Sequence, residues 1–214
     1  MLDFSISNLG PRRYPSPLNI TNFTSDKKRM LFNVYLDDYD SVTDKKGDPI
    51  SVELAGPREK IYFPSDQTKA AIVTCGGLCP GINDVIRSII ITLFYSYEVR
   101  SVWGIRYGFR GLNPACGHEP VALSPDKVKD ITSIGGSILA TSRGPQDVQV
   151  MTDYLRRLKI NILFCIGGDG TIRAAEKLSE EIQKKNLNIA VVCIPKTIDN
   201  DLNLIEKSFG FDTA

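Results

Sequence analysis

From Lys69 onward the chain repeats one pattern: an apolar run, a glycine-containing loop and then an amphipathic stretch. The apolar runs are continuous and rich in Val and Ile, which is typical of parallel strands covered on both faces. They occupy residues 70–75, 99–105, 161–167 and 188–195. Alternating strands and helices predict a doubly wound α/β fold, with a mostly parallel sheet and helices on both faces. In such a sheet, ligands bind beyond the carboxyl ends of the strands.

The stretches between the apolar runs have helical periodicity. Their apolar residues recur every three or four positions, so each predicted helix has one apolar face that can pack on the sheet. These positions are Val85, Ile89 and Leu93 in the first stretch, Val148, Met151, Leu155 and Leu158 in the second, and Ile172, Ala175, Leu178 and Ile182 in the third.

The charge balance argues against several classes of partner. The 214 residues contain 26 Lys+Arg and 25 Asp+Glu, a net charge of +1, so no overall field attracts the chain to nucleic acid or to an anionic membrane. The most apolar run, residues 88–97, is much shorter than the about 20 residues that span a bilayer. The first ten residues contain no basic cluster. We therefore expect no secretory signal, free thiols and a reducing, cytoplasmic location, with a glycosome-like organelle as the alternative.

Residues 1–68 differ in composition from the rest of the chain. They are rich in Pro, Asp and Lys, and the turn-forming sequence DKKGDP separates two strand-like runs, Met30–Leu36 and Lys60–Phe63. We interpret residues 1–68 as an irregular N-terminal arm with short strands. Residues 69–214 are interpreted as a nucleotide-binding α/β lobe that is expected to continue beyond Ala214.

Two glycine loops follow predicted strands and precede predicted helices. The first, GGLCPGIND at 76–84, has the glycine spacing of a P-loop but lacks its Lys and Ser/Thr, so it is either a phosphate site or a structural turn. The second is GGDGT at 167–171, where glycines let backbone amides approach phosphate and Asp169 could hold Mg²⁺. Arg173 stands where a dinucleotide-binding fingerprint needs Gly, which disfavours a Rossmann oxidoreductase. The structural alternative is that Asp169 caps the following helix.

Two further loops carry charged groups suited to phosphoryl transfer. PKTIDND at 195–201 holds two carboxylates beside Lys196, so one carboxylate could accept a proton while the ammonium offsets developing negative charge. TSRGPQD at 141–147 supplies the guanidinium of Arg143 next to a glycine, which suits a phosphate clamp. The alternative for both loops is a solvated turn.

In this order, the motifs GGLCPGIND, YGFRGL, GGSIL with TSRGPQD, GGDGT, PKTIDND and FGFDTA closely resemble the 6-phosphofructokinase family. The resemblance covers residues 69–214, and the pairing of GGDGT with PKTIDND is highly specific. The segments SPLNITNF and AGPREKIYF also resemble the N-terminal extension of the trypanosomatid and plant-like ATP-dependent branch. The resemblance implies transfer of the γ-phosphoryl group of ATP to the 1-hydroxyl of fructose 6-phosphate, in a homo-oligomer, dimer or tetramer, when full length.

The resemblance also implies a role for each site residue. Asp199 would be the catalytic base, and Thr197, Ile198 and Asp199 would bind the sugar phosphate. Asp169 would bind Mg²⁺. The nucleotide would be contacted by Gly77, Arg143, Gly144, Gly168, Asp169, Gly170 and Thr171. The phosphoryl donor would depend on Gly170, which resembles ATP-dependent enzymes, and on Lys196, which resembles pyrophosphate-dependent ones; Gly170 favours ATP.

Several other interpretations remain open at this point. The family continues through a second lobe, so the 214-residue chain alone is expected to turn over poorly. A non-catalytic or regulatory phosphofructokinase-like subunit and a pyrophosphate-dependent phosphofructokinase are the alternatives. Lipid and NAD kinases also use GGDGT after a strand, but they are not expected to carry PKTIDND or TSRGPQD.

Overall fold

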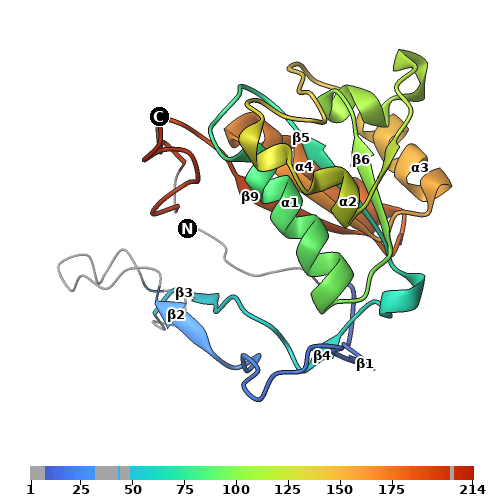
Figure 1. The fold of residues 1–214 in the computed structure, drawn as a ribbon. Coiled ribbons are helices and arrows are strands. Elements are labelled where there is room, and N and C mark those ends of the chain that lie inside the picture. The colour runs from blue at the N-terminus through green and yellow to red at the C-terminus, as the bar shows by residue number, and fades with distance from the viewer. Residues whose placement is uncertain (1–7, 32–42, 44–48, 203–204) are drawn as a thin grey trace. The chain divides into compact units, whose positions relative to one another are not determined.

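The computed structural model describes residues 8–31, 43, 49–202 and 205–214. The chain divides between Tyr62 and Phe63 into two units. The unit Phe63–Ala214 contains a five-stranded sheet with helices on both faces (Figure 1). The unit that ends at Tyr62 contains two small two-stranded sheets.

The five-stranded sheet is mostly parallel, with strand order β7-β6-β5-β8-β9. Strands β5 (Lys69–Thr74), β6 (Ser101–Ile105), β8 (Ile162–Gly167) and β9 (Ala190–Pro195) run parallel, and β7 (Val121–Leu123) is an antiparallel edge strand. Each of the four predicted strands is present. The predicted α/β class with a mostly parallel sheet is therefore confirmed.

Helices cover both faces of this sheet (Figure 1). One face packs against α1 (Ile82–Ile91) and α2 (Pro125–Val128), and the other packs against α3 (Val148–Leu158) and α4 (Asp169–Lys184). A π-helical turn, Thr92–Ser96, extends α1. Short 3₁₀ turns occupy Ser65–Gln67, Gly108–Leu112, Pro114–Cys116 and Ile131–Ser133. Among the described residues, no helix has the length and apolar character needed to cross a membrane.

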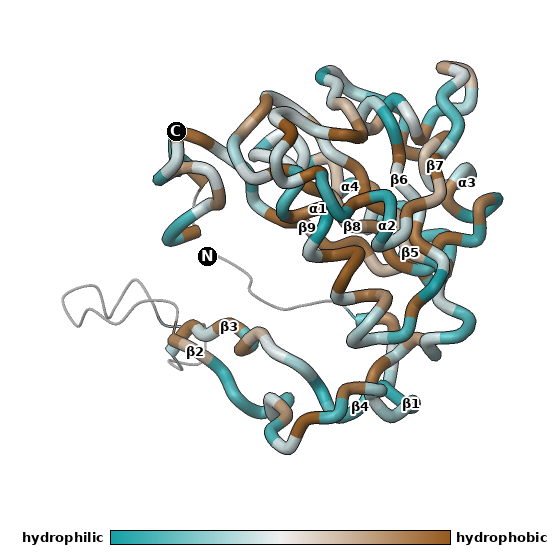
Figure 2. Tube along the Cα trace, in the orientation of Figure 1, coloured by the Kyte–Doolittle hydropathy of each residue, from teal (hydrophilic) through white to brown (hydrophobic). Residues whose placement is uncertain are grey.

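The predicted apolar positions of the first helix, including the buried Leu93, belong to the core, but the most deeply buried stripe lies beside them. Its fully buried residues are Ile82, Ile86 and Ile90, while Val85 and Ile89 are only partly buried at the border of the same core. Isoleucines occupy much of this helix, so its sequence fits more than one helical phase. The hydrophobic parts of the chain nevertheless concentrate along the sheet, where residues 70–73 of β5 are completely buried (Figure 2).

The register of the sheet brings three strand ends together. Thr74 at the end of β5 lies opposite Ile166 of β8, and Gly167 lies opposite Pro195 at the end of β9. Because these strands are parallel, the loops that follow them open at the same edge. The sheet therefore places the GGLCPGIND, GGDGT and PKTIDND loops side by side.

The unit that ends at Tyr62 has short strands. Strand β1 (Tyr14–Pro15) pairs with β4 (Lys60–Ile61), and β2 (Arg29–Leu31) pairs with β3 (Ser51–Glu53). The predicted run at 60–63 therefore begins as a strand. Only the first two residues of the predicted run at 30–36 lie among the described residues, and both belong to β2.

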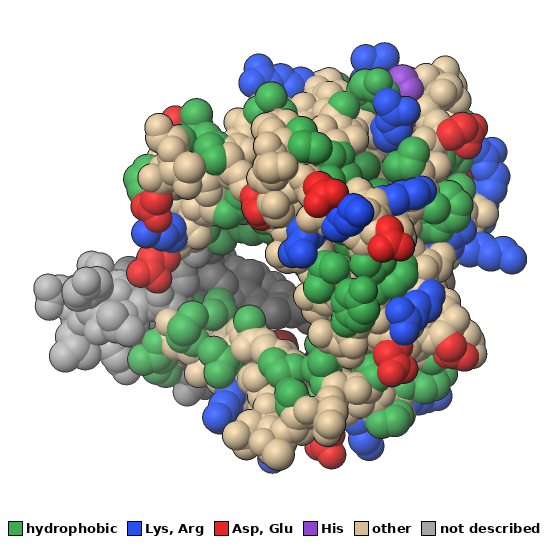
Figure 3. All heavy atoms as spheres, viewed as in Figure 1, with side chains coloured by type: hydrophobic (Ala, Val, Ile, Leu, Met, Phe, Trp, Pro, Cys, Tyr) green, Lys and Arg blue, Asp and Glu red, His purple; other side chains and the backbone are tan. Residues whose placement is uncertain are grey.

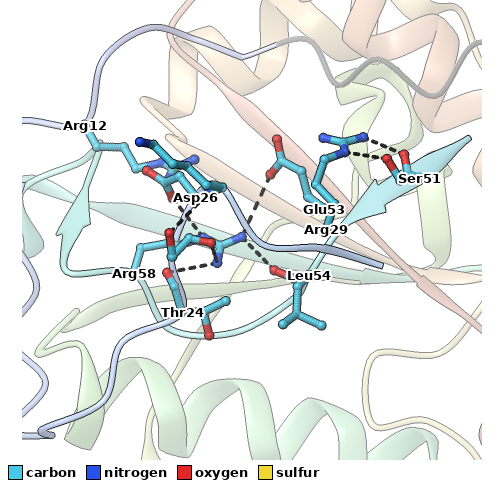
Figure 4. Close-up of polar contacts among 10 residues, drawn as sticks. Arg12, Thr24, Asp26, Arg29, Ser51, Glu53, Leu54 and Arg58 are labelled. Carbon is cyan, nitrogen blue, oxygen red and sulfur yellow. Dashed lines mark hydrogen bonds and ion pairs between the residues drawn. The ribbon is translucent and has the colours of Figure 1, made fainter. Parts of the chain in front are cut away.

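One arginine links several segments of this unit (Figure 4). The guanidinium of Arg58 donates to the carbonyl oxygens of Thr24 and Leu54, at 3.1 and 2.7 Å, and forms an ion pair with Asp26 at 3.2 Å. Asp26 is also paired with Arg12. These contacts join residues far apart in sequence, in a part of the chain with little apolar core.

Candidate functional site

A cavity of about 920 Å³ opens where the three strands end. Its lining includes every site residue that the sequence singled out: Gly77, Arg143, Gly144, Gly168, Asp169, Gly170, Thr171, Lys196, Thr197, Ile198 and Asp199. These residues come from four loops that are separate in the sequence. The structure therefore brings together the whole predicted set.

The N-terminus of α4 faces this cavity without a side-chain cap. Gly168 is the N-cap residue, and Asp169 is the first residue of the helix. The alternative interpretation of Asp169 as the cap is therefore wrong: its carboxylate instead pairs with Arg173 Nε, at 3.0 and 3.1 Å. Helix α3 differs, because Asp147 Oδ1 accepts hydrogen bonds from the Gln149 and Val150 amides. An uncapped helix N-terminus offers amide groups to an anion.

Two glycines of the GGDGT loop have distinct surroundings. A Cβ added at Gly167 would lie 2.1 Å from Thr171 Oγ1, so the close turn into α4 requires glycine there. A Cβ added at Gly170 would meet no atom within 4 Å, although Gly170 lines the cavity. A side chain at position 170 would therefore be accommodated by the fold and would occupy open space beside the cavity.

Lys196 forms hydrogen bonds to both glycine loops. Its side chain is buried, and its ammonium donates a hydrogen bond to the carbonyl oxygen of Gly77. Its backbone amide donates to the carbonyl oxygen of Gly167 at 3.0 Å. Burial lowers the pKa of Lys196 below its ordinary value, and the cation of Arg143 lowers the pKa further. Lys196 thus sets the spacing of the loops and contributes a basic group to the cavity.

The PKTIDND loop is organised by Thr197. The Asp199 amide donates to Thr197 Oγ1 at 3.1 Å, and Thr197 Oγ1 donates to Asp201 Oδ1 at 2.8 Å. Asp199 and Asp201 are both exposed and both line the cavity. Two carboxylates therefore reach the same space as the N-terminus of α4 and Lys196.

Arg143 is exposed and also lines the cavity. It lies near the first glycine loop: a Cβ added at Gly77 would be 3.3 Å from an Arg143 guanidinium nitrogen. The preceding residue, Ser142, accepts a hydrogen bond from the Gly76 amide at 3.1 Å. The TSRGPQD loop is thereby fixed to the GGLCPGIND loop, with its guanidinium beside the cavity.

Several cavity residues were missed in the sequence. Arg173 and Lys177 follow Asp169 at intervals of four residues along α4, and all three line the cavity. This i, i+4, i+8 spacing places the three charged side chains on one face of the helix, and it could have been recognised in the sequence. Leu78 and Phe109, which lie within two of the motifs, and Met151 of α3 add apolar lining that was not predicted.

Two buried thiols also line the cavity, those of Cys75 and Cys79. Burial raises the pKa of Cys75 to about 12 and outweighs the opposing effect of the Lys196 cation. Cys75 therefore remains a protonated thiol at neutral pH. Because the thiolate is the nucleophilic form, Cys75 contributes apolar lining to the cavity and does not act as a nucleophile.

The carboxylates of the cavity suit a magnesium ion carried by a nucleotide. Asp169, the predicted metal ligand, lines the cavity together with Asp199 and Asp201, and all three carry carboxylate oxygens, the type of ligand that Mg²⁺ prefers. The described residues contain no cluster of three or more His, Cys, Asp or Glu side chains arranged as a metal site. Mg²⁺ is usually held by one or two carboxylates together with substrate phosphates, so this donor set fits that ion.

Comparison with known proteins identifies the family of this chain. Residues 69–214 match the model of the family described as Phosphofructokinase. The chain belongs to the phosphofructokinase family. The resemblance inferred from the motifs is therefore confirmed, and the span of the match coincides with the segment that carries them.

Similar curated proteins include relatives from bacteria, trypanosomes and plants. The ATP-dependent 6-phosphofructokinase of Borreliella burgdorferi is 47% identical over 100% of this chain and 48% of its own length. The enzyme of the same name from Trypanosoma cruzi is 50% identical over 78% of this chain and 34% of its own length. ATP-dependent 6-phosphofructokinase 7 of Arabidopsis thaliana is 46% identical over 94% and 41%. The chain thus spans about half or less of the length of these phosphofructokinases.

Solved phosphofructokinases share the fold. The Saccharomyces cerevisiae structure matches with a TM-score of 0.61 and 26% identity, over 70% of this chain and 20% of that chain. A pyrophosphate-dependent phosphofructokinase from Marinobacter aquaeolei matches with a TM-score of 0.61 and 23% identity, over 67% and 37%. The second likeness establishes the fold alone.

Proposed function

We propose that this chain provides the nucleotide-binding and proton-accepting site of an ATP-dependent 6-phosphofructokinase. The reaction would move the γ-phosphoryl group of ATP to the 1-hydroxyl of fructose 6-phosphate. The observation that carries the proposal is the convergence of four separate loops on one cavity, with an uncapped helix N-terminus, a buried lysine and two exposed aspartates. Phosphoryl transfer needs positioning and charge neutralisation rather than covalent catalysis, and these groups supply both.

The residues divide the work as follows. Asp199 accepts the proton of the attacking hydroxyl, while Thr197 and Ile198 bind the sugar phosphate. The glycine amides at the start of α4, together with Arg143, bind the nucleotide phosphates. Gly77, Gly144 and Thr171 complete the nucleotide contacts. The buried ammonium of Lys196 offsets the negative charge that develops on the transferred group.

Asp169 would hold Mg²⁺ with the phosphates of ATP, and the ion would supply charge neutralisation for the transferred group. Binding of Mg·ATP competes with the Asp169–Arg173 ion pair, which is exposed and therefore weak. We expect Asp169→Ala to weaken Mg·ATP binding and to raise the Mg²⁺ concentration needed for half-maximal binding. Calorimetric titration of the chain with ATP at several Mg²⁺ concentrations measures this, and an unchanged Mg²⁺ dependence would contradict the assignment.

ATP is the proposed donor rather than pyrophosphate. The α-phosphate and the nucleoside need the open space that a glycine leaves at position 170. Lys196 adds a cation that either donor tolerates. The curated relatives named above are ATP-dependent enzymes, which supports the same choice.

The proposed partners are small molecules and further copies of the same protein, as a dimer or tetramer. Basic and acidic side chains are interspersed on the face shown in Figure 3, in keeping with the net charge of +1. Such a surface does not favour nucleic acid or anionic membrane. We propose a cytoplasmic location on the sequence argument given above.

Steady-state turnover separates an enzyme from a non-catalytic subunit. The longest natural open reading frame that contains this chain is assayed with fructose 6-phosphate and ATP, and in parallel with pyrophosphate. We expect formation of fructose 1,6-bisphosphate with ATP. Binding of ATP without turnover by either donor would favour the non-catalytic alternative.

A further inference from the structure

Ser208 lies seven residues beyond the PKTIDND motif and is buried, with 4% of its surface exposed. Its Oγ lies 2.8 Å from the carbonyl oxygen of Thr197, to which it donates a hydrogen bond. Its backbone amide donates to Asn200 Oδ1, also at 2.8 Å. The buried Ser208 therefore forms hydrogen bonds to Thr197 and Asn200, the two residues that flank Ile198 and Asp199.

Asn200 uses both ends of its side-chain amide. Oδ1 accepts from the Ser208 amide, and Nδ2 donates to the carbonyl oxygen of Glu206 at 3.0 Å. Its backbone is in the left-handed region, with φ of +51°, a conformation that Asn adopts more readily than most residues. The side chain of Asn200, the residue that follows Asp199, is thus bonded to the backbone of both Glu206 and Ser208.

The segment that contains Ser208 is itself anchored to the rest of the cavity. Phe209 forms a parallel bridge with Lys196, and its carbonyl oxygen accepts a hydrogen bond from Cys79 Sγ at 3.2 Å. A Cβ added at Gly210 would lie 2.0 Å from that Sγ, which shows how closely the segment approaches the first glycine loop. Ser208 therefore connects the Asp199 loop to a segment that is held in place by its contacts with Lys196 and Cys79.

We infer that Ser208 and Asn200 are positioning residues for Asp199. This inference rests on the proposed function, in which Asp199 is the catalytic base. A base must lie within hydrogen-bond reach of the proton that it accepts, but Asp199 is exposed on a loop. Supporting hydrogen bonds that lock the residues on either side supply the required placement. Neither Ser208 nor Asn200 lines the cavity, so both act through Asp199.

The first test compares Ser208→Ala with Ser208→Thr. Ser208→Ala removes the hydroxyl but keeps the backbone bond to Asn200. We expect kcat to fall about tenfold while KM for ATP changes less than about twofold, because the placement of the base matters mainly in the transition state. Ser208→Thr restores the hydroxyl and should recover most of kcat.

Thr68→Val is the matched control. Thr68 is also 4% exposed, and its hydroxyl also donates to a backbone carbonyl, that of Pro64 at 2.6 Å. It precedes β5, at the opposite end of that strand from the cavity. We expect this variant to lose thermal stability but to keep kcat. Equal losses of kcat in Thr68→Val and Ser208→Ala would overturn the inference.

A double-mutant cycle with Asp199→Asn tests whether Ser208 acts through the base. If it does, Ser208→Ala should change kcat less than about twofold in the Asp199→Asn background, because the group that it positions has been removed. The same tenfold loss in both backgrounds would refute the positioning role. A negligible effect of Asp199→Asn itself would instead refute the proposed base, so the two failures are distinguishable.

Asn200→Gly provides the same test if Ser208→Ala does not fold. It removes the acceptor for the Ser208 amide and the donor to the Glu206 carbonyl, adds no charge beside Asp199, and accommodates the φ of +51°. A loss of kcat that disappears in the Asp199→Asn background supports the inference, and a loss that persists there contradicts it.

Discussion

At the residue scale, the proposed choice of ATP as donor can be tested at Gly170. The position is open, so Gly170→Asp should fold, but its carboxylate would repel the α-phosphate region of ATP. We expect kcat/KM for ATP to fall by at least about tenfold, equivalent to about 1.4 kcal/mol. Gly170→Ala is the control, since it adds bulk without charge and should lose less. A wild-type protein that uses pyrophosphate but not ATP would contradict the donor choice and leave the family assignment standing.

Cys75 gives a prediction about pH that does not depend on catalysis. Burial raises its pKa from 9.0 to about 12 in the folded chain. Its contribution to stability is therefore fully present below pH 9.0 and is lost as the pH rises toward 12, because only the unfolded chain ionises there. The free energy of unfolding of the wild type should decline relative to Cys75→Ala above pH 9.0, by up to about 1.4 kcal/mol per pH unit. Urea unfolding under reducing conditions measures this; a difference independent of pH would show that the thiol is accessible to water.

At the scale of elements, the FGFDTA segment packs closely against the first glycine loop. Gly210 has φ of +88°, and a Cβ there would lie 2.0 Å from Cys79 Sγ and 2.7 Å from the Pro80 carbonyl oxygen. Gly144 has a similar φ of +98°, but its Cβ would meet no atom within 4 Å. Both Gly→Ala variants place alanine in a left-handed backbone conformation, which lowers the free energy of unfolding by about 1–2 kcal/mol. Only Gly210→Ala also creates a steric overlap.

We expect Gly210→Ala to lower the free energy of unfolding by about 1–3 kcal/mol more than Gly144→Ala does. Urea unfolding of the 214-residue chain gives both values. Equal losses would mean that the FGFDTA segment does not pack against the first glycine loop as the structure has it.

The elements themselves were predictable to different degrees. The four parallel strands followed from continuous Val- and Ile-rich runs, because strands covered on both faces need apolar residues throughout. β7 was missed because three residues, Val121–Leu123, give too short a pattern to recognise. The most deeply buried stripe of α1 was not identified because the isoleucines of this helix fit more than one helical phase.

The site was predictable where chemistry is concentrated in motifs, and not where it depends on distant contacts. Glycines that follow strands, and carboxylates beside a lysine, are sequence patterns that predict a phosphate-binding site. The proposed role of Ser208 depends on its burial and on its hydrogen bonds to Thr197 and Asn200, which no local sequence pattern reveals. The Arg58 network is a similar case, because its partners at positions 24, 26 and 54 become neighbours only after folding.

At the scale of the whole molecule, the sheet brings three loops to one cavity, and the TSRGPQD loop joins them through the Gly76–Ser142 hydrogen bond. The proposed function places proton acceptance at Asp199 in that cavity. The family assignment supports the idea but does not test the residue. The chain spans about half or less of the relatives named above, so the test belongs in the longest natural open reading frame.

The most direct measurement compares the wild type with Asp199→Asn, using kcat for fructose 6-phosphate and ATP together with the Kd for ATP. We predict that kcat falls about 10²- to 10⁴-fold while the Kd for ATP barely changes, because proton acceptance matters mainly in the transition state. A loss of kcat smaller than about threefold would contradict the account, since Asp199 could not then be the base.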